Sequence, residues 1–440
     1  MFPDRQLRRA LLVAGWLLVG CPGAISYSWA QVGALGGLTG PSLTAPPITV
    51  QSDPFEKPSR SHGVLIADWV IYPSVFFGGL YDSNVNQGVT NKVSSVGGRL
   101  VPSLLAENTD GIHKTTFYGM ADGRAYTQND AGSTVAARAG LIQRYQPVAD
   151  LTVTAQGDYT RQKDLFSTLG IDHSVTTLNP TGVGLSPSVN PQTYNQYTGL
   201  VSVQKAFNQA FVNISGSVVD ILYDSTPTGT QPSNGVTYTG VARGGFWFTP
   251  FFYAYGEGSA DQRRYAFDTF NSHGYRTVGG IGADQGGMWR GEVYGGYQEE
   301  RYDSQLGTVS GNVIGGRIYY SPLRELTIKG SVDESIGVSQ LQPTPTSPIG
   351  TSTRVTASLV EATYALAPEW AAAARFGYIH TTYVGTSRLD DAWTGGATLT
   401  YNLWVNFALT LDYQHVELKS NAPLQSFTRE IVTLGATYTY

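Results

Sequence analysis

The chain ends in Thr433-Leu-Gly-Ala-Thr-Tyr-Thr-Tyr440, and this stretch decides the class of fold. Threonine or glycine alternates in it with aliphatic and aromatic residues, so an extended segment would have one polar and one apolar face. A strand that lies between water and lipid requires this period of two. Because the pattern reaches the last residue, we expect the strand to belong to a sheet that closes on itself.

The composition fits such a sheet and excludes other classes. Of the 440 residues, 14% are charged and 12% are aromatic, and the mean hydropathy is -0.14. A helical membrane protein needs apolar runs of about 18 residues, and none follows the N-terminal region. A transmembrane β-barrel has this average because each lipid-facing residue is matched by a polar residue facing the lumen. The net charge of -5 gives no reason to expect nucleic acid as a partner.

The N-terminal region predicts export. Several arginines precede the apolar stretch 10–20, and small residues around Ala30 suit a cleavage site, so we expect residues 1–30 to be a signal peptide. A second interpretation remains open, in which Cys21 follows a lipobox and is lipidated. Cys21 is the only cysteine of the chain, so disulfides and cysteine-ligated metals are excluded.

Two further segments lack a strand period. Residues 31–62 are rich in Gly, Pro, Ser and Thr and predict a flexible periplasmic leader, with a plug inside the barrel as the alternative. The connection 165–194 is the longest and carries few charges. Connections of this length are usually functional or disordered, so we expect it to fold into or across the mouth.

From Val70 onward, segments with a period of two alternate with connections of two lengths. Short turns are predicted near 107–112, 146–149, 207–209, 249–250, 285–287, 321–323, 367–368 and 403–404. Longer loops are predicted at 83–93, 127–132, 163–193, 224–236, 264–273, 303–308, 338–352, 383–391 and 418–426. This alternation is typical of outer-membrane barrels, so we predict an all-β fold over residues 63–440, a transmembrane antiparallel up-and-down β-barrel of about 18 strands. Pro102 cannot donate to a ladder, which leaves about 16 strands as the alternative.

Charged residues sort to one parity in the segments of the last third of the chain, and the early segments follow this less cleanly. Charges must sort in this way, because a charge on the lipid face near the midplane costs about 2–4 kcal/mol. In 405–414, for example, Asp412 alternates with Leu411 and Tyr413. The candidate lumen-lining residues are Arg99, Arg124, Arg138, Arg243, Arg276, Arg290, Glu292, Arg317, Lys329, Asp333, Arg375 and Asp412.

Two interpretations of these charges remain open. Opposed rings of charge would create a transverse field that selects ions or zwitterionic solutes. Alternatively, the charged groups pair across neighbouring strands and hydrate the wall. The inward-facing tyrosines leave a similar choice between a path for sugar rings and simple packing; they are Tyr118, Tyr126, Tyr253, Tyr255, Tyr294 and Tyr319.

Aromatic residues recur near the predicted strand ends, where amphipathic rings form interfacial girdles. A soluble sandwich or propeller would explain single aromatic residues but not the alternating loop lengths. The girdles are predicted to contain Trp69, Tyr72, Tyr145, Trp247, Trp289, Tyr320, Tyr364, Trp370, Tyr401, Trp404 and Tyr440.

The segment Ile71-Tyr-Pro-Ser-Val-Phe-Phe-Gly-Gly-Leu-Tyr-Asp-Ser-Asn-Val85 resembles the opening strand of the putative β-barrel porin family. The segments 290–297, 321–328 and 399–413 are similar to its later hairpins, and the resemblance covers about residues 64–440. These Gram-negative outer-membrane proteins are often encoded beside surface-polysaccharide genes. The resemblance therefore implies an outer-membrane location and a role in polysaccharide export or surface attachment, and it carries over no catalytic residues.

The terminal octapeptide also resembles the signal, polar-x-Gly-x-x-aromatic-x-aromatic, by which the barrel-assembly machinery recognises outer-membrane proteins. The matching positions are Thr433, Gly435, Tyr438 and Tyr440. The resemblance implies this machinery as a partner, beside the outer-membrane lipid. We expect the terminal strand to pair with the first strand, near 70–82.

The functional prediction is a passive porin-like channel for small hydrophilic solutes or saccharides, without a metal or cofactor. A structural or adhesive barrel with a blocked lumen is the alternative, and a lipid hydrolase or acyltransferase is a third class. Such an enzyme needs a nucleophile beside a base. Only His113 with Thr115 and His380 with Thr382 have this spacing, and neither has an evident acidic residue on the same face. The sequence indicates neither the solute nor the oligomeric state.

Overall fold

The computed structural model describes residues 63–128, 133–163, 193–224, 234–266, 268, 271–284, 288–303, 307–338, 352–423 and 425–440. The predicted signal peptide, the leader with its plug alternative, and most of the connection 165–194 lie outside the described residues. The choice between cleavage at Ala30 and lipidation at Cys21 lies outside them as well.

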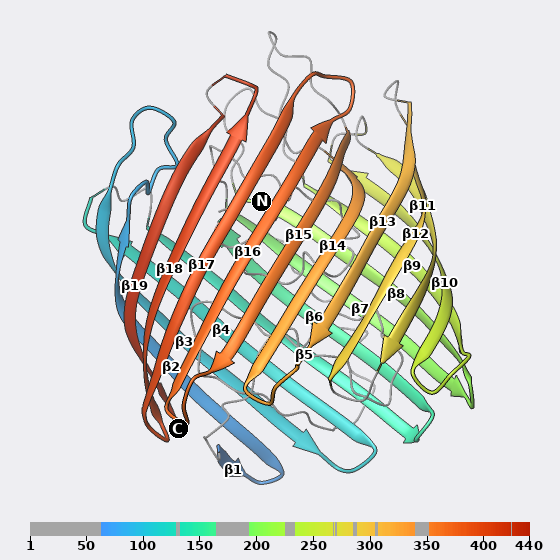
Figure 1. Ribbon diagram of the computed structural model, residues 1–440, viewed down its shortest axis with the longest axis horizontal. Coiled ribbons are helices and arrows are strands. Elements are labelled where there is room, and N and C mark those ends of the chain that lie inside the picture. Colours follow the sequence, from blue (N-terminus) through green and yellow to red (C-terminus); the bar gives the residue numbers. More distant parts are fainter. Residues whose placement is uncertain are drawn as a thin grey trace, which may run out of the picture.

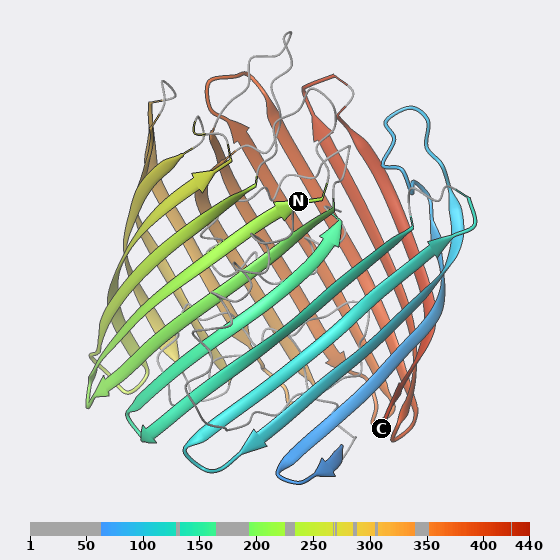
Figure 2. The same ribbon diagram turned by 180° about the vertical axis from the view of Figure 1, so that it is seen from behind.

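Eighteen antiparallel strands, β2 to β19, form one closed barrel, in which each strand pairs with its neighbours in sequence and β19 pairs with β2 (Figures 1 and 2). A short β1 (Val64–Ile66) pairs with the start of β2. The 18-strand prediction is confirmed and the 16-strand alternative is wrong. The strands are β2 (Trp69–Asp82), β3 (Ser95–Thr109), β4 (His113–Tyr126), β5 (Thr134–Val148), β6 (Leu151–Lys163), β7 (Thr193–Phe207), β8 (Ala210–Tyr223), β9 (Gly235–Trp247), β10 (Phe252–Tyr265), β11 (Ser272–Asp284), β12 (Trp289–Tyr302), β13 (Thr308–Tyr320), β14 (Leu326–Val338), β15 (Ser352–Ala365), β16 (Trp370–Tyr383), β17 (Leu389–Trp404), β18 (Phe407–Ser420) and β19 (Phe427–Thr439).

Short and long connections alternate around the barrel, as predicted. The connections after β3, β5, β7, β9, β11, β13, β15 and β17 have two to five residues and lie at the lower end in Figure 1, which we call the turn end. The connections at the opposite end have five residues or more, and we call it the loop end. Pro102 stays within β3 at an exposed position, and the ladder between β3 and β4 is interrupted beside it.

Alternate residues of each strand face lipid and lumen. On β18, Leu409, Leu411 and Tyr413 are 39 to 46% exposed, whereas Thr410 and Asp412 between them are at most 5% exposed. The exposed apolar face is the lipid face. Among the described residues, no helix has the length and hydropathy needed to cross a membrane.

Two of the predicted girdle residues face the lumen instead. Tyr72 is buried against Leu105 and Tyr118, and the Trp247 ring packs 4.6 Å from the Tyr253 ring. Trp247 is the last residue of β9, so no alternating neighbour beyond it fixes its parity. Tyr72 lies inside β2 and shares the inward parity of Ser74 and Phe76.

The closing ladder joins the first and last strands of the barrel. Nine residue pairs connect β19 to β2, from Ile431 with Asp82 to Thr439 with Ser74. On the lumen side, the Nε–H of Arg429 donates a bifurcated hydrogen bond to the Asp82 carboxylate, with 3.0 Å to each oxygen. The predicted pairing of the terminal strand with the first is confirmed.

Candidate functional site: the charged inner wall

A group of six charged residues lies on the inner faces of β9 to β14. Alternation places them there, since each has the parity opposite to the exposed apolar residues of its strand. We call the group the charged wall; its members are Arg243, Glu257, Arg276, Glu292, Arg317 and Asp333.

Glu292 is the centre of the charged wall. Its carboxylate accepts a hydrogen bond of 2.6 Å from Arg243 Nη2 and one of 2.6 Å from Arg317 Nε. Arg243 also approaches Glu257, with 3.4 Å between Nη1 and Oε2. The side chain of Glu292 is 1% exposed. Two guanidinium groups compensate the charge of this enclosed carboxylate.

A second pair completes the charged wall. Arg276 Nη2 lies 3.0 Å from Asp333 Oδ1, and the Tyr294 hydroxyl donates to the same oxygen. Three arginines thus face three carboxylates within the group, so its formal charge is zero. Its hydrogen-bonding groups face a recess that Tyr255 and Ser331 also line.

The other predicted lumen residues are also in contact with partners on the inner face. Asp122 bridges Arg99 at 2.8 Å and Arg124 at 2.9 Å. The remaining contacts are Arg138 with Asp158 at 2.9 Å, Lys329 with Glu361 at 3.6 Å, Arg375 with Asp412 at 3.0 Å, and the Arg290 guanidinium 4.8 Å from the centre of the Tyr319 ring. This geometry matches the interpretation that the charges pair across the wall. Whether these residues contact a solute stays a prediction.

Several ion pairs at the loop end were missed. Arg429 contacts Asp82, Arg388 contacts Asp390 and Arg263 contacts both Asp261 and Glu300. The period-two pattern predicts that Arg429 faces inward, because it continues the inward series of Ile431 and Thr433, so alternation could have identified it. Arg388 precedes β17, so no strand pattern includes it.

The inward-facing tyrosines are parts of the wall. The ring of Tyr253 covers Gly282, where an added Cβ would come within 2.0 Å of the ring. The hydroxyl of Tyr253 donates to Glu292 at 3.1 Å, and that of Tyr118 donates to Asp158 at 2.5 Å. Aromatic rings that cover glycines stabilise a sheet locally. The contacts of these two tyrosines therefore support packing rather than a path for sugars.

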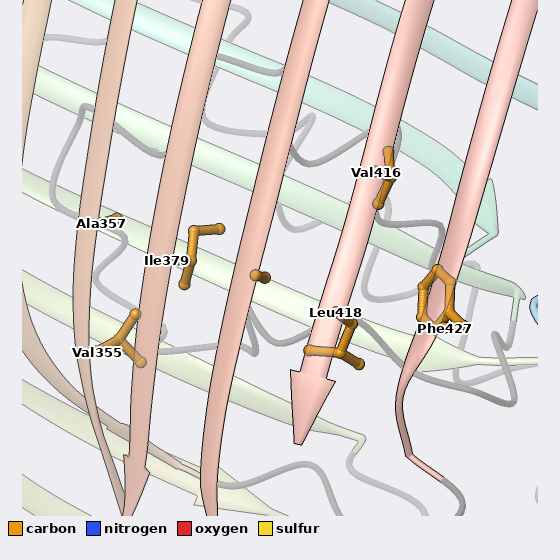
Figure 3. Packing of buried hydrophobic residues seen from close by; sticks show 7 residues of the cluster. Val355, Ala357, Ile379, Val416, Leu418 and Phe427 are labelled. Atoms are coloured by element: carbon orange, nitrogen blue, oxygen red, sulfur yellow. The ribbon is translucent and has the colours of Figure 1, made fainter. Parts of the chain in front are cut away.

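An aliphatic row lies on the inner face of the next strands around the barrel, β15 to β19. Ala357, Ile379, Ala392, Leu418 and Phe427 are directly opposed in register across β15 to β19. Figure 3 shows four of these side chains, labelled, on neighbouring strands. Each member is at most 8% exposed. The sequence analysis did not identify this row, because a single apolar residue per strand does not disturb the period of two.

The prediction that His380 lacks an acidic neighbour was wrong. His380 Nδ1 lies 2.8 Å from Asp391 Oδ1, and His380 Nε2 lies 3.3 Å from the Thr382 hydroxyl. Asp391 pairs directly with His380 in the β16 to β17 ladder, a register that the sequence does not reveal. His113, the other histidine considered as a catalytic base, stacks on Tyr145. Within the described part of the chain, no three His, Cys, Asp or Glu side chains are placed to hold a metal ion.

Comparisons with known proteins give one family. No curated protein matches the chain. Among solved structures, Pseudomonas aeruginosa OpdL is 11% identical, with 85% of this chain and 99% of that chain covered and a TM-score of 0.43. Acinetobacter baumannii OccAB4 is 10% identical (84% and 98% covered, TM-score 0.43), and the copper transporter OprC is 11% identical (88% and 83%, TM-score 0.45). Scores this low say nothing about what the pore carries. The family described as putative beta-barrel porin 2 matches residues 57–440, and the chain therefore belongs to the putative β-barrel porin family.

Proposed function

We propose that the protein is a passive outer-membrane channel for small uncharged hydrophilic solutes, saccharides included, and that it catalyses no reaction in this role. As in other outer-membrane barrels, the turn end of this channel would face the periplasm and the loop end would face the cell exterior. The link to surface-polysaccharide export, which the family resemblance implies, belongs to the same proposal.

The compensation of charge in the charged wall carries the proposal. Arg243 and Arg317 face Glu292 and Glu257, and Arg276 faces Asp333, so neither sign is left in excess within the group. A pore selects ions by a net field from rings of one charge. A wall of internally paired groups keeps the lumen hydrated, yet it offers ions of either sign little preference.

Purified protein in liposomes tests the proposal. We expect swelling in solutions of small sugars, with rates that fall as the sugar grows, and we expect a reversal potential near zero under a KCl gradient in planar bilayers. Correctly folded protein that gives neither swelling nor conductance would reject the channel. That result would favour the structural or adhesive barrel with a blocked lumen.

Glu292→Gln sharpens the test. The substitution leaves Arg243 and Arg317 with one carboxylate fewer, so the reversal potential should shift toward chloride preference. Asp150→Asn is the matched control, because it also removes one carboxylate but lies in an exposed turn, paired with Lys205 at 2.5 Å. An equal shift in both variants would show that the charged wall does not determine selectivity.

A second candidate function rests on Thr382, His380 and Asp391. This chain of hydroxyl, imidazole and carboxylate has the order of an acyl-hydrolase triad. It lies on the lipid face of β16 and β17, where the rings of Tyr378 and Trp393 are 4.1 Å apart. The ester groups of membrane lipids lie at the depth of such aromatic girdles. Phospholipid hydrolysis that Thr382→Val abolishes and Thr382→Ser retains would establish this activity, and no release of fatty acid by the native protein would exclude it.

A further inference from the structure

One pair of neighbouring strands is joined over only part of its length. The ladder between β13 and β14 has six residue pairs, from Gly315 with Asp333 to Tyr320 with Ile328, whereas the other neighbours in the barrel share nine to fourteen. Both strands continue toward the loop end. β13 stays paired with β12 as far as Thr308, and β14 stays paired with β15 as far as Val338. We call the point where the ladder stops, on the loop-end side of Gly315 and Asp333, the fork.

Beyond the fork, β14 overlaps the inner face of the neighbouring strands. Gln298, on the inner face of β12, donates to the Ile336 carbonyl at 3.2 Å and accepts from the Ile336 amide at 3.1 Å. These bonds reach across β13. Ile336 is 1% exposed, although its parity on β14 is that of the lipid-facing residues. The β14–β15 hairpin is thus displaced inward, and side chains replace the backbone ladder.

Arg354 of β15 makes the other contacts of the overlap. Its Nε lies 3.1 Å from Glu334 Oε1, and its Nη2 donates to the Asn312 carbonyl of β13 at 3.3 Å. The same nitrogen lies 1.6 Å from where a Cβ of Gly311 would be. Only glycine at position 311 leaves room for this guanidinium against the inner face of β13.

The fork lies within the depth of the membrane. Tyr320 belongs to the girdle at the turn end, and five residues of a tilted strand rise about 13 Å from it to the fork, in an apolar band about 25 Å tall. Above the fork, Ile314 still faces lipid and is 63% exposed. Asn312 lies level with Tyr297, whose ring is 6.3 Å from that of Tyr275. The interrupted ladder therefore spans the outer-leaflet side of the band.

Such an interruption is unfavourable for a barrel that serves only as a wall. Backbone groups in the apolar region need internal partners, and closed barrels normally supply them along every strand. Among the described residues, the contacts across the interruption come from side chains that can rotate away. They include the two Gln298 bonds, the Arg354 bond and a hydrogen bond between Tyr302 and Ser352. Opening the overlap would require no backbone pair of β12–β13 or β14–β15 to break.

We call the overlap of β13 and β14 beyond the fork the seam. We propose that this seam opens sideways and lets an amphiphile with an aliphatic chain pass between the lumen and the outer leaflet. A polar solute gains nothing from a lateral exit into lipid, whereas an amphiphile is stable there. The aliphatic row begins at the same level, because Ala357 is the β15 partner of Asp333 at the fork. An aliphatic chain that leaves the lumen thus has an apolar strip of wall beside the seam.

Cross-linking tests the seam. Gln298→Cys with Ile336→Cys, joined by a short reducible bis-thiosulfonate, would hold the overlap shut. Glu299→Cys with Ser310→Cys is the matched control, since these residues pair directly across β12 and β13 and do not bridge the seam. Liposomes are loaded with a fluorescent lysophosphatidylcholine, and external serum albumin extracts the probe that reaches the outer leaflet.

The seam cross-link should reduce extraction to the level of protein-free vesicles, and reduction of the cross-link should restore it. The control cross-link should leave extraction unchanged, and sugar-induced swelling should persist in both variants. Extraction that the seam cross-link does not slow, or native protein that swells vesicles with sugar but transfers no probe, would overturn the lateral route. If the native protein causes no sugar-induced swelling of the vesicles, the channel proposal is overturned instead.

Discussion

At the scale of the residue, rings and glycines fit together within the wall. Tyr253 pairs in register with Gly282 and covers it, so Gly282→Ala must displace the ring and weaken its bond to Glu292. Overpacking of this kind costs about 1–3 kcal/mol. We expect the free energy of unfolding by urea in lipid vesicles to fall by about this amount. Gly256→Ala is the control, because nothing lies within 4 Å of its added Cβ. Equal stability of the two variants would contradict this account.

A surface carboxylate at the loop end provides a pH-dependent contribution. Asp224 follows β8, and hydrogen bonds from Arg161 hold the pKa of its carboxyl below the usual range. A group whose pKa is lower in the folded state stabilises the fold above its unfolded-state pKa and loses that effect as the pH falls through the folded value. Both side chains are more than a third exposed, so the contribution is below about 1 kcal/mol.

Asp224→Asn should therefore lower stability slightly at pH 7 and not at strongly acid pH. Urea unfolding of the native protein and the variant at both pH values measures this difference. A difference that grows on acidification would show that Asp224 is not stabilised as a carboxylate.

At the scale of the element, the strands and their parity were predictable, but several cross-strand partners were not. Period-two patterning alone predicts Asp412 inward and Leu411 outward, as the structure has them. It could not reveal that Asp391 faces His380, because the pattern within a strand does not contain the register between strands. The fork between β13 and β14 was hidden for the same reason. The sequence of β14 does carry one sign of it, because Glu334 places a charge at a lipid-facing parity directly after Asp333, where the strand leaves its neighbour.

The terminal strand combines the closing ladder with the proposed assembly signal. Tyr438 and Tyr440 are 43% and 56% exposed, so they contribute little to packing in the monomer. We expect replacement of both by alanine to lower the yield of folded barrel when the assembly machinery inserts the protein into membranes, with little effect on conductance per inserted molecule.

The control for this prediction replaces Tyr320 and Tyr364 by alanine. These girdle tyrosines are 38% and 41% exposed, and they lie on internal strands. Assembly should be less affected than in the terminal variant. Equal assembly of the two double variants, measured by the gel shift between folded and heated protein, would show that the terminal tyrosines act only as girdle residues.

At the scale of the whole molecule, charge is balanced locally rather than by distant rings. Arg243 with Glu292, Arg138 with Asp158 and Arg375 with Asp412 occupy different sectors of the wall, and each sector carries both signs. Parity supplied the candidate charges, but their pairing depends on the register and on side-chain length. The sequence alone could therefore not decide between a transverse field from opposed rings of charge and a wall whose charges compensate one another.

This local balance makes ion selectivity depend on pH. Acidification protonates carboxylates, whereas arginines keep their charge throughout the accessible range. The lumen should thus change from nearly non-selective at neutral pH to anion-selective in acid, and salt should weaken the change because it screens the exposed groups. Reversal potentials under a KCl gradient, measured from pH 7 downward, test this. A preference for potassium that increases in acid would mean that carboxylates remain ionised and in excess along the path, and that the arginines of the charged wall do not face the permeating ion.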